Sequence, residues 1–264
     1  KKRFIVTGGN SGLGYDTAKE LAKAGGTVIL ACRSVERCET AKKSILVEAP
    51  NAKVECLKLD LSSQESIRLF VKNYVKWFST VDVLINNAGL STKVREETVD
   101  GFESHMGANH FGPFYLTSLL YPHFNRNGKI INHSSSMHYL VFSKEPMLND
   151  VNSEKDFSLA NSYSKSKLAN LLFTFELNRR LEASGNPKNL LGIAVHPGFT
   201  ATNLQNSKFP FWREINEYIA MKLHHGALAQ IEAAASSKVK ASIDSYYGPK
   251  YISFGIPAVS DVSS

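Results

Sequence analysis

The chain has 264 residues, of which 43% are hydrophobic and 21% are charged, a composition typical of a folded globular protein and unlike that of a disordered or fibrous chain. Its 31 basic and 24 acidic side chains give a net charge of +7, but the basic residues are scattered in short groups among acidic ones. This distribution argues against a nucleic-acid-binding groove. We therefore expect one domain over residues 1–264 and no nucleic-acid partner.

The three cysteines, Cys32, Cys38 and Cys56, are odd in number and lack the spacing of zinc ligands. They predict neither a disulfide framework nor a metal site, and they favour a reducing intracellular compartment. No apolar run approaches the ~18 residues of a membrane span. Because the first residue is Lys1 and not Met, an upstream anchor could have been removed. The expected location is the cytoplasm or the cytosolic face of a membrane, with peripheral membrane contact and homodimer formation left open.

Apolar, β-rich runs alternate with amphipathic stretches of helical length from the first residues onward. The alternation is the βαβ rhythm of an α/β domain. Several of these runs are almost continuously apolar, as expected for parallel strands buried on both faces. The predicted strands cover residues 3–7, 27–31, 53–59, 81–85, 129–134, 190–195 and 247–253.

A glycine-rich turn, residues 8–14, follows the first strand and precedes a helix expected over residues 16–24. Glycines allow the backbone to approach a pyrophosphate, and the helix N-terminus offers unpaired N–H groups to its charge. The spacing differs from G-x-G-x-x-G, so a purely structural turn is about equally compatible with the sequence. The expected cofactor contacts here are Gly8, Asn10, Ser11, Gly12, Leu13 and Gly14.

The second predicted strand is followed by Arg33 and by no acidic residue. An acidic side chain at this place would accept hydrogen bonds from the adenosine ribose of NAD, whereas a guanidinium suits a 2′-phosphate. The pattern favours NADP(H), although Arg33 could also be a solvated loop cation.

Polar residues also follow the third and fourth predicted strands. Asp60, followed by Leu61, could meet the adenine amino group, could cap the helix that begins near Ser63, or could do both. The fourth strand leads into Asn87, Ala88 and Gly89, small residues at the edge where doubly wound sheets bind ligands.

A helix is predicted to begin at Tyr163, and Tyr163 and Lys167 are four residues apart on it and therefore share one face. At an effective dielectric of ~20, an ammonium ~4 Å from a phenol contributes roughly 4 kcal/mol, which corresponds to about three pKa units. The spacing thus predicts that Lys167 moves the pKa of Tyr163 toward neutrality. Serines 134–136 end the preceding strand and complete a candidate catalytic set.

Taken in order, these motifs resemble the short-chain dehydrogenase/reductase family over essentially the whole chain: T-G-x-x-x-G-x-G, N-N-A-G, S, Y-x-x-x-K and P-G. The resemblance implies that Tyr163 donates or accepts the proton and that Lys167 is its cationic partner and ribose ligand. Ser135 would orient the substrate oxygen, with Ser136 as the alternative register. Asn109 would hold a water in the proton relay. Near the nicotinamide, the resemblance implies Pro197, Gly198, Thr200 and Thr202.

Within that family, the chain is similar to the retinol dehydrogenase branch at residues 31–33, 100–103 and 163–173. This similarity implies NADP(H) as cofactor and a small lipophilic substrate. Residues 203–223 are rich in aromatic side chains and follow the P-G turn, so we expect a substrate-side flap there, although packing on the body of the domain is also open.

The expected fold is a single doubly wound Rossmann domain, with a seven-stranded parallel sheet in the order 3-2-1-4-5-6-7 and helices on both faces. The expected function is NADP(H)-dependent interconversion of an alcohol and an aldehyde or ketone, on a retinoid-, steroid- or fatty-carbonyl-like compound. The alternatives are a protochlorophyllide-reductase-like enzyme and a nucleotide-binding regulatory module without turnover. The histidines, His133 included, are expected to be surface or packing residues.

Overall fold

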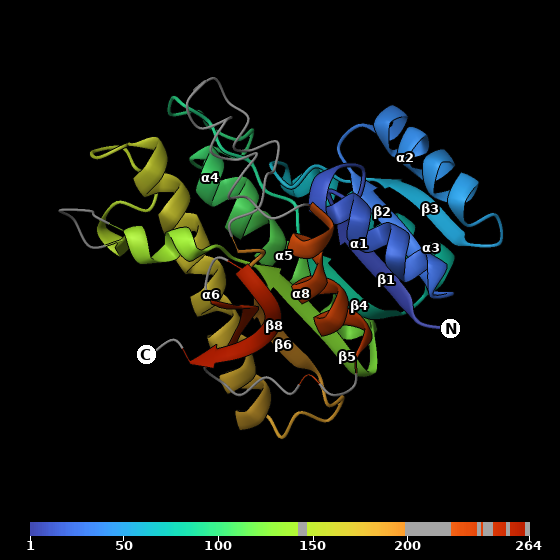
Figure 1. Ribbon diagram of the computed structural model, residues 1–264. Helices are drawn as coiled ribbons and strands as arrows, with labels where there is room; N and C mark the ends of the chain where they lie inside the picture. Colours follow the sequence, from blue (N-terminus) through green and yellow to red (C-terminus); the bar gives the residue numbers. More distant parts are fainter. Residues whose placement is uncertain (142–146, 199–222, 237–238, 240–244, 252–253, 262–264) are drawn as a thin grey trace.

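The central sheet joins strands from both ends of the chain (Figure 1). The computed structural model describes residues 1–141, 147–198, 223–236, 239, 245–251 and 254–261. Within these residues, eight strands pair in the order β3-β2-β1-β4-β5-β6-β7-β8. Their bounds are β1 Arg3–Thr7, β2 Thr27–Cys32, β3 Lys53–Lys58, β4 Val81–Asn86, β5 Phe124–His133, β6 Leu191–Val195, β7 Ser245–Tyr251 and β8 Phe254–Asp261. No helix in the described part of the chain is both long and apolar enough to cross a bilayer.

The first seven strands are parallel and confirm the predicted order. β5 begins at Phe124, five residues before the predicted start, and β7 begins at Ser245 and ends at Tyr251, two residues earlier at each end than predicted. An eighth strand, β8, was not predicted and pairs with β7 in the antiparallel direction. Pro257 lies within β8. Proline hides a strand signal but is tolerated at a sheet edge, which is where β8 lies in the described sheet.

Successive side chains of each central strand enter two different cores. In β1, Phe4 and Val6 pack with α1, α2 and α8, whereas Ile5 packs with α3, α5 and α6. Figure 1 shows α1 and α8 next to each other over one face of the sheet. Burial on both faces explains why these strands are continuously apolar. The helices are α1 Gly12–Lys23, α2 Val35–Glu48, α3 Gln64–Phe78, α4 Ser104–Met106, α5 Gly112–Leu120, α6 Leu159–Ala183 and α8 Leu223–Ala235.

Two helices begin earlier than the sequence pattern predicts. α1 starts at Gly12 inside the glycine turn, and not at Asp16. α6 starts at Leu159, after Ser158, whose side chain caps the helix by accepting a hydrogen bond from the backbone N–H of Asn161. Tyr163 therefore lies in the second turn of α6, where the helix is already regular.

The carboxyl ends of β1, β2 and β4 are held together by hydrogen bonds through Thr7 and Gly8. The Thr7 hydroxyl donates to the carbonyl of Ile85 (3.2 Å) and accepts from the N–H of Ala88 (2.9 Å). The N–H of Gly8 donates to the carbonyl of Ala31 (2.9 Å). The loops that leave these strands therefore meet at one edge, the usual ligand-binding edge of a parallel sheet.

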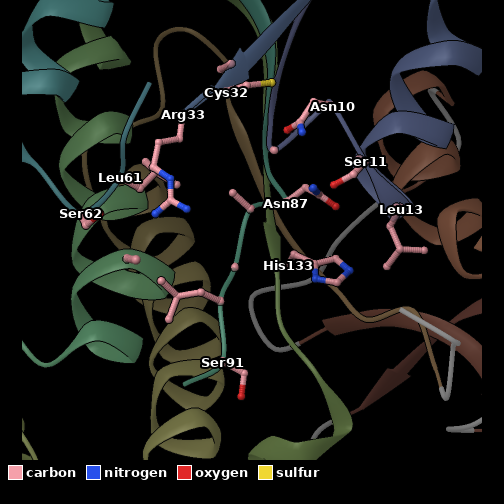
Figure 2. Close-up of a pocket in the computed structure, with 18 of the residues that line it drawn as sticks. Asn10, Ser11, Leu13, Cys32, Arg33, Leu61, Ser62, Asn87, Ser91 and His133 are labelled. Carbon is pink, nitrogen blue, oxygen red and sulfur yellow. The ribbon is translucent and has the colours of Figure 1, made fainter. Parts of the chain in front are cut away.

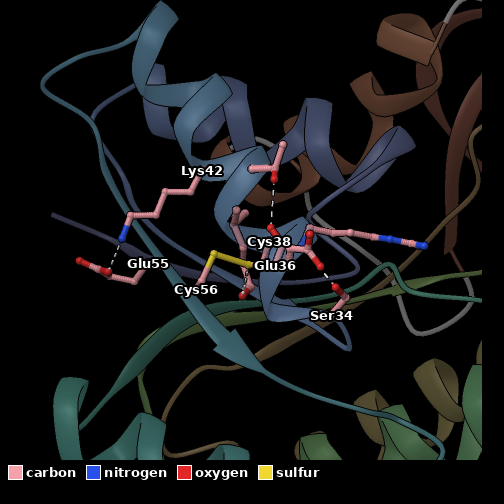
Figure 3. Close-up of a disulfide and its surroundings, with 9 residues drawn as sticks. Ser34, Glu36, Cys38, Lys42, Glu55 and Cys56 are labelled. Carbon is pink, nitrogen blue, oxygen red and sulfur yellow. Dashed lines mark hydrogen bonds and ion pairs between the residues drawn. A yellow bond between two sulfur atoms is a disulfide. The ribbon is translucent and has the colours of Figure 1, made fainter.

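The prediction of no disulfide was wrong. Cys38 on α2 and Cys56 on β3 form one, with their Cα atoms 5.9 Å apart, and Cys32 remains free and buried (Figure 3). The two cysteines are 18 residues apart, and only the packing of α2 against β3 brings them together. The inference of a reducing compartment from the cysteine count loses its support, because disulfides persist mainly in oxidising surroundings.

Peptide mapping under non-reducing conditions should recover Cys38 and Cys56 as one linked pair. Burial raises the pKa of Cys32 to about 12, so this thiol should resist alkylation until the protein is unfolded. Reduction should lower the free energy of unfolding by about 3 kcal/mol, the magnitude typical of a short closed loop. In the double variant Cys38→Ser/Cys56→Ser, adding the reductant should leave the free energy of unfolding unchanged. Alkylation of both cysteines in the untreated native protein would contradict the pairing.

Candidate active site

One cavity of about 910 Å³ lies along the carboxyl edge of the sheet. In Figure 2, Arg33, Leu61 and Ser62 lie on one side of it, His133 lies on the other, and Asn87 lies between them. It is lined by the following residues that the sequence analysis singled out: Gly8, Asn10, Ser11, Gly12, Leu13, Gly14, Arg33, Asp60, Leu61, Asn87, Ala88, Gly89, Ser135, Tyr163, Lys167, Pro197 and Gly198.

The glycine turn leaves room for a ligand at the start of α1. A Cβ atom on Gly12 would meet no atom within 4 Å, and the φ of +57° at this residue favours glycine. A Cβ on Gly14 would lie only 2.4 Å from Nδ2 of Asn87, so glycine is required for that close approach. Ser11 precedes α1 without a side-chain capping hydrogen bond, and the first turn carries no acidic residue. The free backbone N–H groups in the first turn of α1 are therefore suited to bind a diphosphate.

Two guanidinium groups border the same end of the cavity. Arg33 directly follows β2, and Arg37 lies in the first turn of α2; both side chains are exposed. Ser34 caps α2 by accepting a hydrogen bond from the backbone N–H of Arg37 (3.2 Å). Arg37 was not among the predicted site residues, although its position four residues after Arg33, at a helix start, was a usable signal. Two cations at one place are well suited to bind a phosphate group.

Asp60 borders the cavity and does not cap α3. The cap is Ser63, whose hydroxyl accepts from the backbone N–H of Ser66 (3.2 Å). One carboxylate oxygen of Asp60 accepts from the N–H of Ser62 (3.0 Å). Of the two roles that the sequence left open for Asp60, the capping role is wrong, and contact with the adenine stays a prediction.

Asn87 is fixed from both ends of its side-chain amide. Its Nδ2 donates to the carbonyl of Thr7 (2.9 Å), and its Oδ1 accepts from Nε2 of Gln230 on α8 (3.3 Å). Gln230 also donates to the carbonyl of Leu13 (3.1 Å). This buried glutamine links α8 to the glycine turn. No local sequence pattern predicts this link, because the bonded residues lie far apart in the chain.

Tyr163 and Lys167 face the cavity from one side of α6. The Ser135 side chain borders the cavity and partly offsets the effect of burial on the pKa of Tyr163, whereas Ser136 does not border the cavity. The Lys167 ammonium lies 5.4 Å from the centre of the Tyr163 ring and donates to the carbonyl of His133 (3.3 Å). The geometry therefore favours Ser135 over Ser136 as the serine that acts with Tyr163.

The expected shift of Tyr163 toward neutrality was wrong. Burial raises the pKa of Tyr163 to about 12, and the Ser135 side chain offsets only part of this effect. Burial also lowers the pKa of Lys167 to about 8. Both groups leave water, which disfavours the phenolate and the ammonium alike, and spacing along a helix does not reveal this cost. The phenol of Tyr163 is thus neutral at neutral pH.

Asn109 lies behind the cavity wall and bonds to the segment after β4. It belongs to a π-helical turn, Gly107–Phe111, a deviation from α-helix that is frequent at functional sites. Its Oδ1 accepts from the N–H of Leu90 (2.8 Å), and its Nδ2 donates to the carbonyl of Leu90 (3.0 Å) and to the Ser166 hydroxyl (3.1 Å). Its side chain therefore supports the site without lining the cavity.

His133 lines the cavity, contrary to the expectation of a surface or packing role. Burial, with smaller effects of Lys167 and His196, lowers the pKa of His133 to about 3, so the ring is neutral. Thr200, Thr202 and residues 203–222 of the expected flap lie outside the described residues.

Known proteins share this fold and parts of this sequence. A family model for the short chain dehydrogenases matches residues 2–145. Human retinol dehydrogenase 11 is 42% identical over 214 residues, which cover 80% of this chain and 65% of the human protein. The crystal structure of an uncharacterised protein from Mycobacterium paratuberculosis superposes with a TM-score of 0.79 at 36% identity and covers 98% of this chain and 85% of that one. The chain thus spans less than two thirds of the human relative.

A further solved structure shares the fold at lower identity. It is a short chain dehydrogenase from Burkholderia cenocepacia in complex with NADP, with a TM-score of 0.69 at 23% identity, covering 88% of this chain and 90% of that one. At this identity the likeness concerns the fold alone.

If Lys167 binds the ribose of a nicotinamide dinucleotide as an ammonium, affinity should fall as the pH rises through the lysine pKa of about 8. Lys167 is mostly protonated well below that pH and loses its proton above it, so NADH should bind roughly 30-fold more weakly near pH 9.5 than near pH 7 if only the ammonium form binds. NADH is the better probe because it lacks a titrating 2′-phosphate. Fluorescence titration measures the affinity, and Lys167→Met should give a flat profile. An equal decline in that variant would assign the effect to another group.

Proposed function

Because the chain belongs to the short chain dehydrogenase family, we propose that it is an oxidoreductase that interconverts an alcohol and an aldehyde or ketone with NADP(H). The observation that carries this proposal is a single cavity with two chemically different ends. Arg33 and Arg37 border one end, and Ser135, Tyr163 and Lys167 belong to the other. A cofactor that spans both would bring its redox group to the tyrosine.

The residues around the cavity suit a phosphorylated dinucleotide. The first turn of α1 would hold the diphosphate, Arg33 and Arg37 would hold a 2′-phosphate, and Asp60 would meet the adenine. Lys167 would donate to the nicotinamide ribose, with Pro197 and Gly198 nearby. When bound, NADPH supplies a hydride to the carbonyl carbon.

The protein's own side chains hold and transfer the proton that the substrate oxygen receives. Tyr163 holds it on the phenolic oxygen and gives it to the substrate oxygen, and the Ser135 hydroxyl donates a hydrogen bond to the same oxygen. Because burial raises the pKa of Tyr163 to about 12, the neutral phenol is the form present at physiological pH. This state favours carbonyl reduction, in which the tyrosine begins as the donor.

We extend the proposal to a small lipophilic substrate. The human relative is named for retinol, which is a lipophilic alcohol. Residues 203–223 include Phe209, Phe211 and Trp212, an aromatic content that suits a lipophilic substrate. The substrate panel for testing the enzyme should therefore contain aldehydes and ketones of graded hydrophobicity, retinal among them.

Tyr163→Phe should abolish NADPH oxidation with every member of that panel, because the variant keeps the ring and loses the proton. Its affinity for NADPH should stay within a few-fold of the parent, as measured by fluorescence. Ser135→Ala should lower kcat by roughly 10² or more, the loss typical of one oriented oxyanion donor. Ser136→Ala is the matched control and should keep near-parental kcat.

A near-parental rate in Tyr163→Phe would contradict the mechanism. If the parent binds NADPH and oxidises it with none of the compounds, the chain is a nucleotide-binding module without turnover. Turnover that requires light would favour the protochlorophyllide-reductase alternative.

The parent should prefer NADPH over NADH by at least about tenfold, because a charged hydrogen bond to the 2′-phosphate contributes ~1.5 to 3 kcal/mol. Arg33→Ala should weaken NADPH binding and hardly change NADH binding, and Arg37→Ala should have a smaller effect of the same kind. Titration of both cofactors measures the difference. Equal affinities in the parent would contradict the assignment of NADP(H).

A further inference from the structure

A buried carboxylate–imidazole pair lies directly behind the tyrosine of the site. Glu103 and His105 both have fully buried side chains, and Oε1 of Glu103 lies 2.6 Å from Nδ1 of His105. The same carboxylate accepts from the backbone N–H groups of His105 (2.9 Å) and Met106 (3.0 Å) at the start of α4. Burial raises the pKa of Glu103, but these hydrogen bonds outweigh it and hold the pKa below its usual range. The pair is therefore a fixed anchor for the imidazole.

The second ring nitrogen of His105 defines the tautomer. Its Nε2 accepts a hydrogen bond from the backbone N–H of Thr92 (3.1 Å) and therefore carries no proton. The proton of the neutral ring must lie on Nδ1, where it is donated to Glu103. A ring held at both nitrogens cannot exchange protons without breaking one of these bonds, so it is suited to positioning and not to acid–base chemistry.

His105 contacts two different walls of the site. Thr92 ends the segment that leaves β4 and lines the cavity at Gly89, Leu90 and Ser91. Leu90 is already fixed by the Asn109 amide, so His105 provides a second attachment two residues further along. On its other side, the His105 ring meets the Tyr163 ring nearly at a right angle (83°), with the ring centres 6.2 Å apart.

We propose that His105, held by Glu103, is a positioning residue that sets the separation between Tyr163 and the segment Gly89–Thr92. The inference deepens the proposed function and rests on it, because the separation matters only if Tyr163 delivers a proton to a substrate in the cavity. Misplacement of a proton donor by a fraction of a hydrogen-bond length slows the chemical step while leaving distant cofactor contacts intact.

The test uses the full chain, NADPH and the best carbonyl substrate of the panel. His105→Gln replaces the ring by a flexible amide that can still pair with Glu103. It should lower kcat per NADPH-binding site by about tenfold or more. The Kd for NADPH should stay within about threefold of the parent, because Arg33 and the glycine turn are untouched. His123→Gln is the matched control, since this residue directly precedes β5 at the opposite edge of the sheet, and its kcat should equal that of the parent.

A second variant and a spectrum of the parent test the positioning role independently, in case His105→Gln fails to fold. His105→Phe keeps a ring beside Tyr163 but offers no acceptor to the N–H of Thr92, and it should show the same loss of kcat at constant NADPH affinity. In ¹⁵N-histidine spectra of the parent recorded near pH 8, the His105 ring should carry its proton on Nδ1. The resonance is assigned by its absence in either variant, and the measurement needs no turnover.

Three results would overturn the positioning role: parental kcat in a folded His105 variant, a loss of kcat proportional to a loss of NADPH-binding protein, or a proton on Nε2. Its failure can be separated from failure of the proposed function. If Tyr163→Phe abolishes turnover while His105→Gln keeps the parental kcat, only the positioning role is wrong. If the parent itself turns over no carbonyl compound, the proposed function fails and the positioning role fails with it.

Discussion

The geometry of the site depends on the hydrogen bonds that the side-chain amide of Asn109 makes with Leu90. This amide pairs with both the N–H and the carbonyl of Leu90. The backbone carbonyl of Asn109 accepts a hydrogen bond from Nδ2 of Asn170 on α6 (2.9 Å). Since Asn170 also donates to the carbonyl of His133 (3.1 Å), the segment after β4, the π-helical turn, α6 and the end of β5 are joined by two amides. Each element contributes one wall of the cavity or one functional side chain, so none can move alone without leaving a buried polar group unpaired.

Hydrogen bonds between buried side-chain amides also connect α6 to the sheet. Asn86 at the end of β4 donates to Oδ1 of Asn132 on β5 (2.8 Å), and Asn132 donates to the hydroxyl of Thr174 on α6 (2.9 Å). Apolar packing alone would tolerate small slips between α6 and the sheet, whereas a chain of paired amides has only one satisfied register. The apolar cores stabilise the fold, and the buried amides determine where α6 lies on it. The position of Tyr163 and Lys167 follows from the second effect.

Local patterns predicted much of the fold and of the cavity lining, because the features concerned are set by short stretches of chain. The strand–turn–helix around Gly12 and the four-residue spacing of Tyr163 and Lys167 are of this kind. What the sequence could not reveal depends on tertiary packing. Gln230 reaches the glycine turn from the far end of the chain, and Cys38 meets Cys56 only when α2 packs on β3. The direction of the pKa shift at Tyr163 was missed for the same reason, since burial is a property of the folded protein.

Arg33 and Arg37 differ from the rest of the site in one respect: their side chains are exposed, whereas Lys167 and the amides that position α6 are buried. Exposed side chains contribute little to the free energy of folding, so substitutions at these two positions should cost almost no stability. Under the proposed function, the same substitutions would change the recognition of the cofactor. Substitutions at the buried end change both properties together. If the proposed function holds, the choice between the two nicotinamide cofactors is therefore open to evolutionary drift and to redesign, while the end of the cavity that holds Tyr163 is constrained by the need to fold.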